Sequence, residues 1–221
     1  MALVRDAVAD VLRNTSLVPV AARSIVTTLP SSAGGEVGSL DVVAGHDLLR
    51  YLAVGLRVFS SAPQPALLEE LHRCLTGGQG FKPANRVLTV TSDHHVVTAQ
   101  ETAHAMLRGL FKPTDCIRVV TAVSELARNI YLYAQTGEVR LTMAEEPDWS
   151  LLFQVVAQDR GPGIPNLDEI LSGSYRSKTG LGKGLLGART LLDGLDIKTG
   201  PGGTTIKGFK KSRPPDLSRN P

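Results

Sequence analysis

Glu125 and Asn129 are the first residues whose types and spacing could do chemistry. They lie in the run 119–131, where apolar residues recur at steps of three and four, which predicts a helix with one buried stripe. Both residues lie off that stripe and one helical turn apart. A carboxylate can act as a general base, and a carboxamide oxygen can bind a hard metal ion. Such pairs are also common on solvated helix surfaces, so the pair alone decides nothing.

Three glycine-rich segments follow along the chain, at residues 159–165, 180–187 and 200–205. In the first, an acid at a predicted strand end precedes glycines, so the backbone could approach a flat ligand that donates to the carboxylate. The second opens a predicted helix, whose amide groups and dipole suit phosphates. The third places threonines where they could complete the hydrogen bonding of the flat ligand. As structure alone, the first would be a capped tight turn and the third a hairpin turn.

Familiar nucleotide and metal motifs do not explain these segments. Gly182, Gly184 and Gly187 match a dinucleotide-binding spacing, but no apolar strand precedes them and no acid-bearing strand follows at the expected distance. A Walker loop is excluded because no Gly-Lys-Ser/Thr triplet occurs. The histidines at 94, 95 and 104 have no cysteines or acids at ligand spacing, so no zinc site is expected.

Composition narrows the classes of partner and compartment. The chain has 221 residues and a net charge of +3, without a stripe of basic and aromatic residues, so nucleic acid is not expected as a partner. No apolar run reaches the ~18 residues of a membrane span, so no membrane partner is expected. Charged residues are spaced through the first 14 positions, unlike a secretory leader, and the two cysteines sit in unrelated contexts. We therefore expect reduced thiols and a cytoplasmic location.

The pattern of the chain predicts two parts and a tail. Residues 1–80 are expected to form a small all-helical module that serves dimerisation or partner recruitment, and 81–211 a mixed domain of helices and strands. Residues 212–221 have too few apolar side chains to pack. Helices are predicted at 2–13, 18–29, 40–59, 66–75, 96–111, around Glu125 and at 184–195. Strands are predicted at 86–90, 138–143, 149–158 and 204–210, the middle two as a hairpin, and 164–179 is predicted to be a polar loop.

Taken in order, these motifs resemble the GHKL ATPase/kinase superfamily. The run from Ser124 to Ala134 is most similar to the anti-sigma-factor serine kinases, and within them to the stressosome switch kinases. The resemblance covers about residues 85–211. It implies an α+β fold, a GHKL (Bergerat-type) two-layer α/β sandwich with helices on one face of a mixed sheet and ATP between the layers, here preceded by the small all-helical module.

The resemblance also implies roles for particular residues. Glu125 would be the general base and Asn129 the Mg²⁺ ligand. Asp159 would contact the adenine amino group, helped through water by Thr204 or Thr205. The backbone at Gly161 and Gly163 would pass close to the adenine base. The segment Gly180, Leu181, Gly182, Lys183 and Gly184 would wrap the phosphates beneath a short lid. The positive charge and position of Arg128 and Lys183 would let them contact phosphate. Asn166 stands where many members of the superfamily carry an acid, and Asp168 follows two residues later. The lid of this chain therefore differs in detail from the pattern of the superfamily.

The function implied is an ATP- and Mg²⁺-dependent protein serine/threonine kinase of the anti-sigma or switch-kinase type. Its substrate would be a STAS-domain antagonist in a stress or sigma-factor partner switch, with a PP2C-type phosphatase or a sigma factor as a further partner. One alternative is a docking switch that binds nucleotide without significant kinase activity. Another is a histidine-kinase-like protein, because His46-Asp47 faintly resembles a phosphoacceptor box. No proline follows to bend that helix, so His46 is expected to be a surface histidine.

Overall fold

The computed structural model describes residues 2–15, 17, 19–59, 65–172 and 183–212. These residues form two compact units. The helical unit comprises the described residues of 2–84 together with 144–150, and the sheet unit comprises the described residues of 85–143 and 151–212. The helical unit thus extends slightly beyond residue 80 and takes in the tip of a hairpin that belongs, by sequence, to the second half of the chain.

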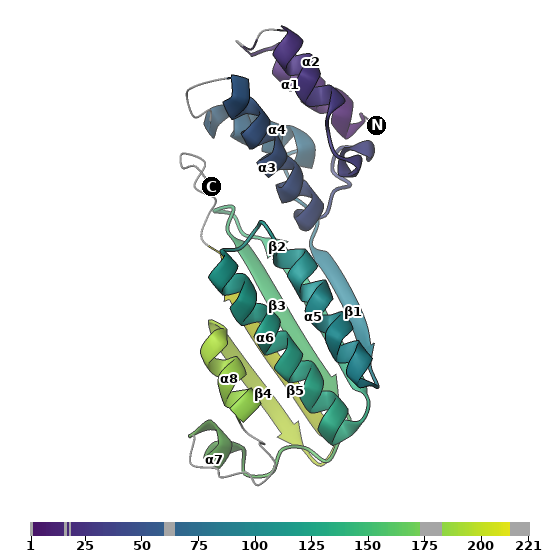
Figure 1. The fold of residues 1–221 in the computed structure, drawn as a ribbon, viewed down its shortest axis with the longest axis vertical. Helices are drawn as coiled ribbons and strands as arrows, with labels where there is room; N and C mark the ends of the chain where they lie inside the picture. The colour runs from purple at the N-terminus through teal and green to yellow at the C-terminus, as the bar shows by residue number, and fades with distance from the viewer. Residues whose placement is uncertain (1, 16, 18, 60–64, 173–182, 213–221) are drawn as a thin grey trace. The chain divides into compact units, whose positions relative to one another are not determined.

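The sheet unit is a two-layer sandwich, as the sequence predicted. Its five strands lie in the order β1-β2-β3-β5-β4, and helices α5, α6 and α8 lie on one face of the sheet (Figure 1). The strands are β1 Ala84–Val90, β2 Gly137–Glu145, β3 Leu151–Asp159, β4 Gly194–Gly200 and β5 Gly203–Lys211. The helices are α5 Asp93–Leu107, α6 Pro113–Asn129, the short α7 Leu167–Leu171 and α8 Lys183–Leu191.

The sheet is antiparallel rather than mixed. The pairs β3/β5 and β4/β5 are antiparallel, and the neighbouring strands β2 and β3 follow each other directly as a hairpin. The connection between β1 and β2 explains the difference, because it contains two helices that run in opposite directions. A single crossover helix would bring the chain back parallel to β1, whereas the second helix returns it to the opposite end.

Helix α6 is formed and oriented by its sequence pattern. Pro113 occupies its first turn, where a missing N–H costs nothing. Its apolar stripe, which includes Val119, Val123 and Leu126, is fully buried, so the opposite face is free to carry polar residues. After Asn129 the helix widens into a π-helical turn, Ile130–Ala134, which the sequence did not predict. Such turns are rare and often occur at functional sites.

Two segments of the sheet unit differ from the predictions. The helix predicted over 184–195 ends at Leu191, and Gly194–Gly200 forms the unpredicted edge strand β4. Gly194 pairs with Phe209 of β5, and an added Cβ would collide with the Phe209 ring, so glycine allows this pairing. The short helix α7 lies within the predicted polar loop, where Ile170 is buried.

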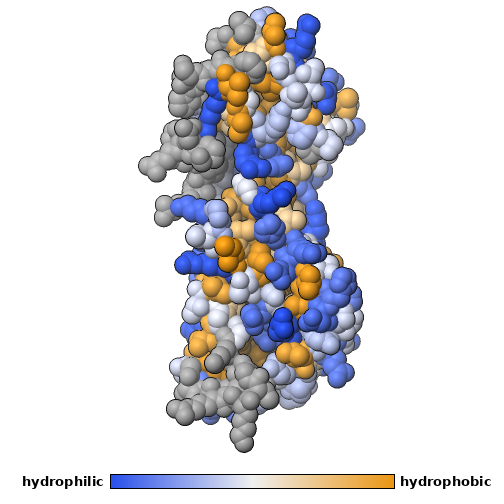
Figure 2. Space-filling view, in the orientation of Figure 1, coloured by the Kyte–Doolittle hydropathy of each residue, from blue (hydrophilic) through white to orange (hydrophobic). Residues whose placement is uncertain are grey.

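The helical unit contains the four helices that the sequence predicted. They are α1 Val4–Arg13, α2 Pro19–Thr27, α3 Val42–Phe59 and α4 Pro65–Thr76, with a 3₁₀ turn at Ser31–Gly34. Helices α1, α3 and α4 each bury a leucine- or valine-rich face, which includes Val8, Leu12, Leu52 and Leu71, and α2 buries Ala21, Ala22 and Ile25. On the visible face, apolar side chains occur in small groups among polar ones (Figure 2). No helix in the described ranges is long and apolar enough to cross a membrane.

Candidate functional site

A cavity of about 240 Å³ lies within the sheet unit, between the end of α6, the end of β3 and the beginning of β5. Its wall is mostly apolar, with a few polar groups, as is typical of sites for small ligands. Helix α6 and its π-helical turn supply one side, the segment after β3 a second, and β5 a third. The lining residues are Leu126, Asn129, Ile130, Tyr133, Ala134, Ala157, Asp159, Gly161, Pro162, Gly163, Ile164, Pro165, Ile170, Leu185, Thr204 and Ile206.

Asp159 is the acidic side chain that lines this cavity. Its Oδ1 accepts hydrogen bonds from the backbone N–H of Gly161 at 2.8 Å and of Thr204 at 3.1 Å. These two bonds fix the carboxylate at the end of β3. Oδ2 accepts no hydrogen bond from the residues that the structure describes. The half-buried Asp159 therefore keeps one oxygen that can accept a hydrogen bond from a ligand in the cavity.

Two threonine hydroxyls continue the polar wall. Thr204 is buried, and its Oγ1 lies 2.9 Å from Oγ1 of Thr199 on the neighbouring strand β4. Thr199 Oγ1 also accepts a hydrogen bond from the backbone N–H of Ile164 at 2.8 Å. Either hydroxyl can be the donor in the Thr199–Thr204 hydrogen bond. The chain of bonds ties the segment after β3 to the β4–β5 hairpin beside Asp159.

The glycines of this region are required by close backbone approach. Gly163 has φ +82°, and an added Cβ would collide with the carbonyl of Gly200. Gly203 has φ +125°, and its Cβ would collide with the carbonyl of Asp159. Left-handed backbone at such values favours glycine. These residues bring the two loops close enough to form the cavity rim.

The two polar residues of α6 occupy different places. Asn129 lines the cavity, whereas Glu125, one turn earlier, is not among the lining residues. The Glu125 carboxylate instead lies against the start of α8, where a Cβ added to Gly184 would collide with its Oε2. Glycine at position 184 therefore allows the carboxylate to approach the α8 backbone. Asn129 and Glu125 thus extend from the cavity toward the N-terminus of α8.

The remaining predicted site residues are separated by the structure. Thr205 pairs with Gln158 and Lys198 on the opposite face of the sheet, since successive strand residues point to opposite sides. Arg128 is exposed on α6 and does not line the cavity. Lys183 begins α8. Gly180, Leu181 and Gly182 lie outside the described residues.

Several lining residues were not predicted. Tyr133 and Ala134 reach the cavity through the π-helical turn, and Ile170 reaches it from the unpredicted helix α7. Leu185 enters from α8. Thr199 could have been found by pairing the strands across the 200–203 turn, because it then stands directly opposite Thr204.

Comparisons with known proteins agree with this architecture. A family model described as a histidine kinase-like ATPase domain matches residues 89–208. The serine/threonine-protein kinase RsbT of Bacillus subtilis (strain 168) is 33% identical over 123 residues, which cover 55% of this chain and 92% of RsbT.

Solved structures give weaker matches. The RsbU and RsbW domains of Rv1364c from Mycobacterium tuberculosis are 20% identical with a TM-score of 0.42, covering 77% of this chain and 48% of theirs. The SiaB–SiaC complex from Pseudomonas aeruginosa is 14% identical with a TM-score of 0.38, covering 58% of this chain and 89% of the matched chain. The family match spans more than half of the sequence, and it includes every described residue of the cavity. The chain therefore belongs to the histidine kinase-like ATPase domain family.

Proposed function

We propose that this chain is an ATP- and Mg²⁺-dependent protein serine/threonine kinase that phosphorylates a STAS-domain antagonist in a partner switch. The observation that carries the proposal is the cavity at Asp159, which joins a ligand-facing carboxylate oxygen to Asn129 and leads toward Glu125. The relationship to RsbT, a serine/threonine-protein kinase, supports the reaction class.

The cavity suits the adenine end of ATP. A purine is flat and apolar on both faces, and its amino group is a hydrogen-bond donor. The apolar wall, which includes Ile130, Ile164 and Ile206, would cover the faces, and Asp159 Oδ2 would accept from the amino group. At about 240 Å³ the cavity is smaller than most ligand pockets, which fits one end of a nucleotide rather than all of it.

The residues beyond the cavity suit the phosphate end. In the proposed role the carboxamide oxygen of Asn129 would bind Mg²⁺, which would neutralise charge on the phosphate oxygens. Glu125 would accept the proton of the serine or threonine hydroxyl as that oxygen attacks the terminal phosphorus. The N-terminus of α8 beside Glu125 would add a positive dipole end near the phosphates.

The histidine-kinase alternative fits the structure less well. His46 is buried rather than exposed, so the prediction of a surface histidine was wrong. Its Nε2 lies 2.6 Å from the carboxylate of Glu145. A phosphoacceptor must be reached by a nucleotide held in another part of the protein, and this side chain is 8% exposed and already engaged. The docking-switch alternative remains the second candidate, because Glu125 does not line the cavity itself.

Phosphoryl transfer with a matched pair of variants tests the proposal. The chain is incubated with ATP labelled at the terminal phosphate, Mg²⁺ and purified STAS-domain proteins. We expect label on serine or threonine of a STAS protein, and we expect Glu125→Gln to lower the rate by about 10²–10⁴-fold with ATP binding unchanged. Glu101→Gln, an exposed acid on α5, is the control and should label normally.

Three outcomes would contradict the kinase role as stated. Equal labelling by Glu125→Gln would remove the assigned base. Label on a histidine of this chain would favour the histidine-kinase alternative. ATP binding and firm STAS docking with no transfer by wild type would favour a docking switch, in which a PP2C-type phosphatase or a sigma factor responds to the docked state.

A further inference from the structure

Thr199 lies directly behind the wall of the Asp159 cavity. It is a half-buried residue near the end of β4, and it is not among the residues that line the cavity. In the β4–β5 pairing it stands opposite Thr204. The roles proposed above for the nucleotide site do not use Thr199. Its hydroxyl nevertheless bonds to two residues that do line the cavity.

The first of these contacts fastens the segment that follows β3. The backbone N–H of Ile164 donates to Oγ1 of Thr199 at 2.8 Å, and Ile164 is part of the apolar wall. Pro162 and Pro165 have no N–H to donate. The bond to Thr199 is the one hydrogen bond that the structure describes between residues 162–165 and another element. The position of this part of the wall therefore depends on the Thr199 hydroxyl.

The second contact holds the polar side of the cavity. Thr204 is 6% exposed, and its Oγ1 lies 2.9 Å from Oγ1 of Thr199. A buried hydroxyl is costly without a hydrogen-bond partner, and among the described residues that partner is Thr199. A threonine hydroxyl hydrogen can rotate to suit its partners. Thr199 therefore restricts the directions that the Thr204 hydroxyl can take beside Asp159.

The arrangement leaves the Thr204 hydroxyl able to serve a ligand. The Ile164 N–H can only donate, so Oγ1 of Thr199 accepts that bond in every case. If Thr199 in turn donates to Thr204, the hydrogen of Thr204 is free for a ligand acceptor, such as a ring nitrogen of adenine. In that state the Ile164 N–H, both hydroxyls and the ligand atom all have partners.

We propose that Thr199 is a positioning residue for nucleotide binding, which acts through Ile164 and Thr204 without touching the nucleotide. The inference rests on the proposed ATP site. Both groups that Thr199 holds belong to the part of the site assigned to adenine. Its loss should therefore weaken ATP and ADP alike, and it should raise the KM for ATP without lowering kcat. Glu125→Gln should do the reverse, because Glu125 is assigned to the transfer step.

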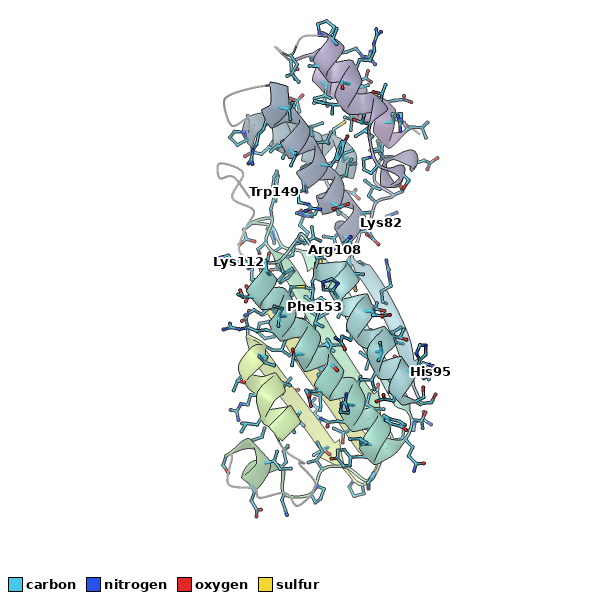
Figure 3. All side chains as sticks on the ribbon, viewed as in Figure 1. Lys82, His95, Arg108, Lys112, Trp149 and Phe153 are labelled. Atoms are coloured by element: carbon cyan, nitrogen blue, oxygen red, sulfur yellow. The ribbon has the colours of Figure 1, made fainter. Side chains whose placement is uncertain are left out.

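Two substitutions at this position and one control test the role in the full-length protein. Thr199→Val removes the hydroxyl at nearly constant volume, and valine suits a strand. The core of the sheet unit, in which Phe153 is fully buried (Figure 3), is unchanged. Thr199→Ser keeps the hydroxyl. Thr142→Val, at a half-buried threonine of β2 outside the cavity wall, is the control.

Isothermal titration gives the effect on binding. We expect Thr199→Val to weaken both ATP and ADP about three- to tenfold, and Thr199→Ser to stay within about twofold of wild type. Thr142→Val should bind like wild type. In Thr199→Val/Thr204→Val the loss should be smaller than the product of the two single losses, because the two hydroxyls act together.

Amide hydrogen exchange gives a readout that needs no nucleotide. The Ile164 N–H of the free protein should exchange faster in Thr199→Val than in wild type, and Thr199→Ser should restore its protection. Unchanged exchange in Thr199→Val would overturn the bond on which the inference depends.

The binding results separate this inference from the proposed function. Absence of ATP binding by folded wild type would contradict the ATP site, and the role of Thr199 would be overturned with it. If wild type binds ATP, the inference alone is overturned by any of three results. These are equal affinity in Thr199→Val, a loss in Thr199→Ser as large as in Thr199→Val, or a double variant that shows the full product of the single losses.

Discussion

At Asp159 the two carboxylate oxygens have separate roles. Oδ1 is engaged by the N–H groups of Gly161 and Thr204, which holds the side chain at the end of β3. Oδ2 is the oxygen that a ligand can use. The sequence predicted Asp159 and its glycines because an acid followed by glycines after a strand is a local pattern. It could not choose between Thr204 and Thr205, since that choice depends on the phase of β5 relative to the core.

The structure turns that open choice into a prediction. Thr204 is buried beside Asp159, and its hydroxyl is within hydrogen-bond distance of Thr199, whereas Thr205 lies on the other face of the sheet. Thr204→Val removes a hydroxyl from the cavity wall at nearly constant volume, and we expect ATP affinity to fall about three- to tenfold. Thr205→Val should bind like wild type. Isothermal titration checks both, and a loss of affinity in Thr205→Val alone would reverse the assignment.

At the scale of elements, long periodic segments were predicted well and short ones were not. Helix α6 and the β2–β3 hairpin follow from apolar periodicity. The predicted helix extends into the beginning of strand β4, because the apolar residues of 191–195 fit the periodicity of a helix as well as that of a strand. Only the pairing with β5 distinguishes the two. The π-helical turn after Asn129 has no sequence signature, and Gln135, which ends it with φ +64°, is not a residue that usually marks a left-handed position.

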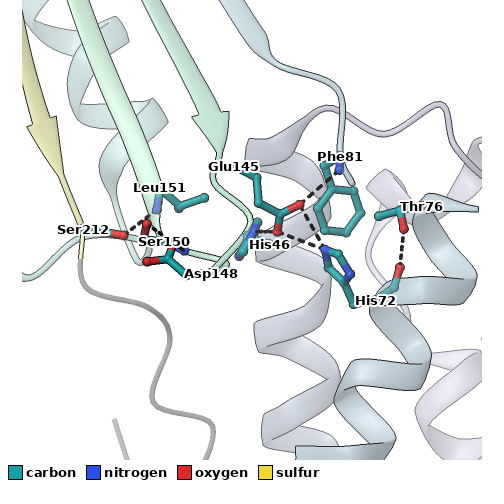
Figure 4. Close-up of polar contacts among 9 residues, drawn as sticks. All are labelled: His46, His72, Thr76, Phe81, Glu145, Asp148, Ser150, Leu151 and Ser212. Carbon is teal, nitrogen blue, oxygen red and sulfur yellow. Dashed lines mark hydrogen bonds and ion pairs between the residues drawn. The ribbon is translucent and has the colours of Figure 1, made fainter. Parts of the chain in front are cut away.

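Within the helical unit, Glu145 of the hairpin tip contacts His46 of α3 and His72 of α4 (Figure 4). No local sequence pattern indicates these contacts, because His46, His72 and Phe81 are 64 to 99 positions away from Glu145. Burial alone would raise the pKa of Glu145, but the bonds and charges of the two histidines outweigh it and lower the pKa to about 2. The carboxylate is therefore more readily ionised in the folded protein than in the unfolded chain, where its pKa is about 4.5.

This pKa predicts a defined loss of stability in acid. A lowered carboxylate pKa stabilises the fold above the unfolded-state value and ceases to do so as pH falls through the folded-state value. We expect Glu145 to contribute about 1–3 kcal/mol at neutral pH and to lose this between about pH 5 and pH 2. Urea unfolding measured against pH checks this in wild type and Glu145→Gln, with Glu70→Gln as the control. If the difference between wild type and Glu145→Gln does not shrink over that window, the histidine–carboxylate cluster does not hold the tip as described.

For the whole molecule, the sequence predicted an α/β sandwich beside a set of helices, and both are present. His46 is polar and next to Asp47 in sequence, so only the fold reveals that it is buried. We propose that the helical unit serves partner recruitment or dimerisation.

The central claim is that the Asp159 cavity binds the adenine of ATP, and isothermal titration tests it most directly. Wild type, Asp159→Asn and the control Asp196→Asn, an exposed acid on β4, are titrated with ATP with and without Mg²⁺. Asparagine can keep the two backbone bonds at Oδ1 but replaces the ligand-facing oxygen by a donor. We predict saturable binding by wild type and Asp196→Asn that Mg²⁺ strengthens, and about 10–100-fold weaker binding by Asp159→Asn. Equal affinity in Asp159→Asn, or no binding by folded wild type, would contradict the claim.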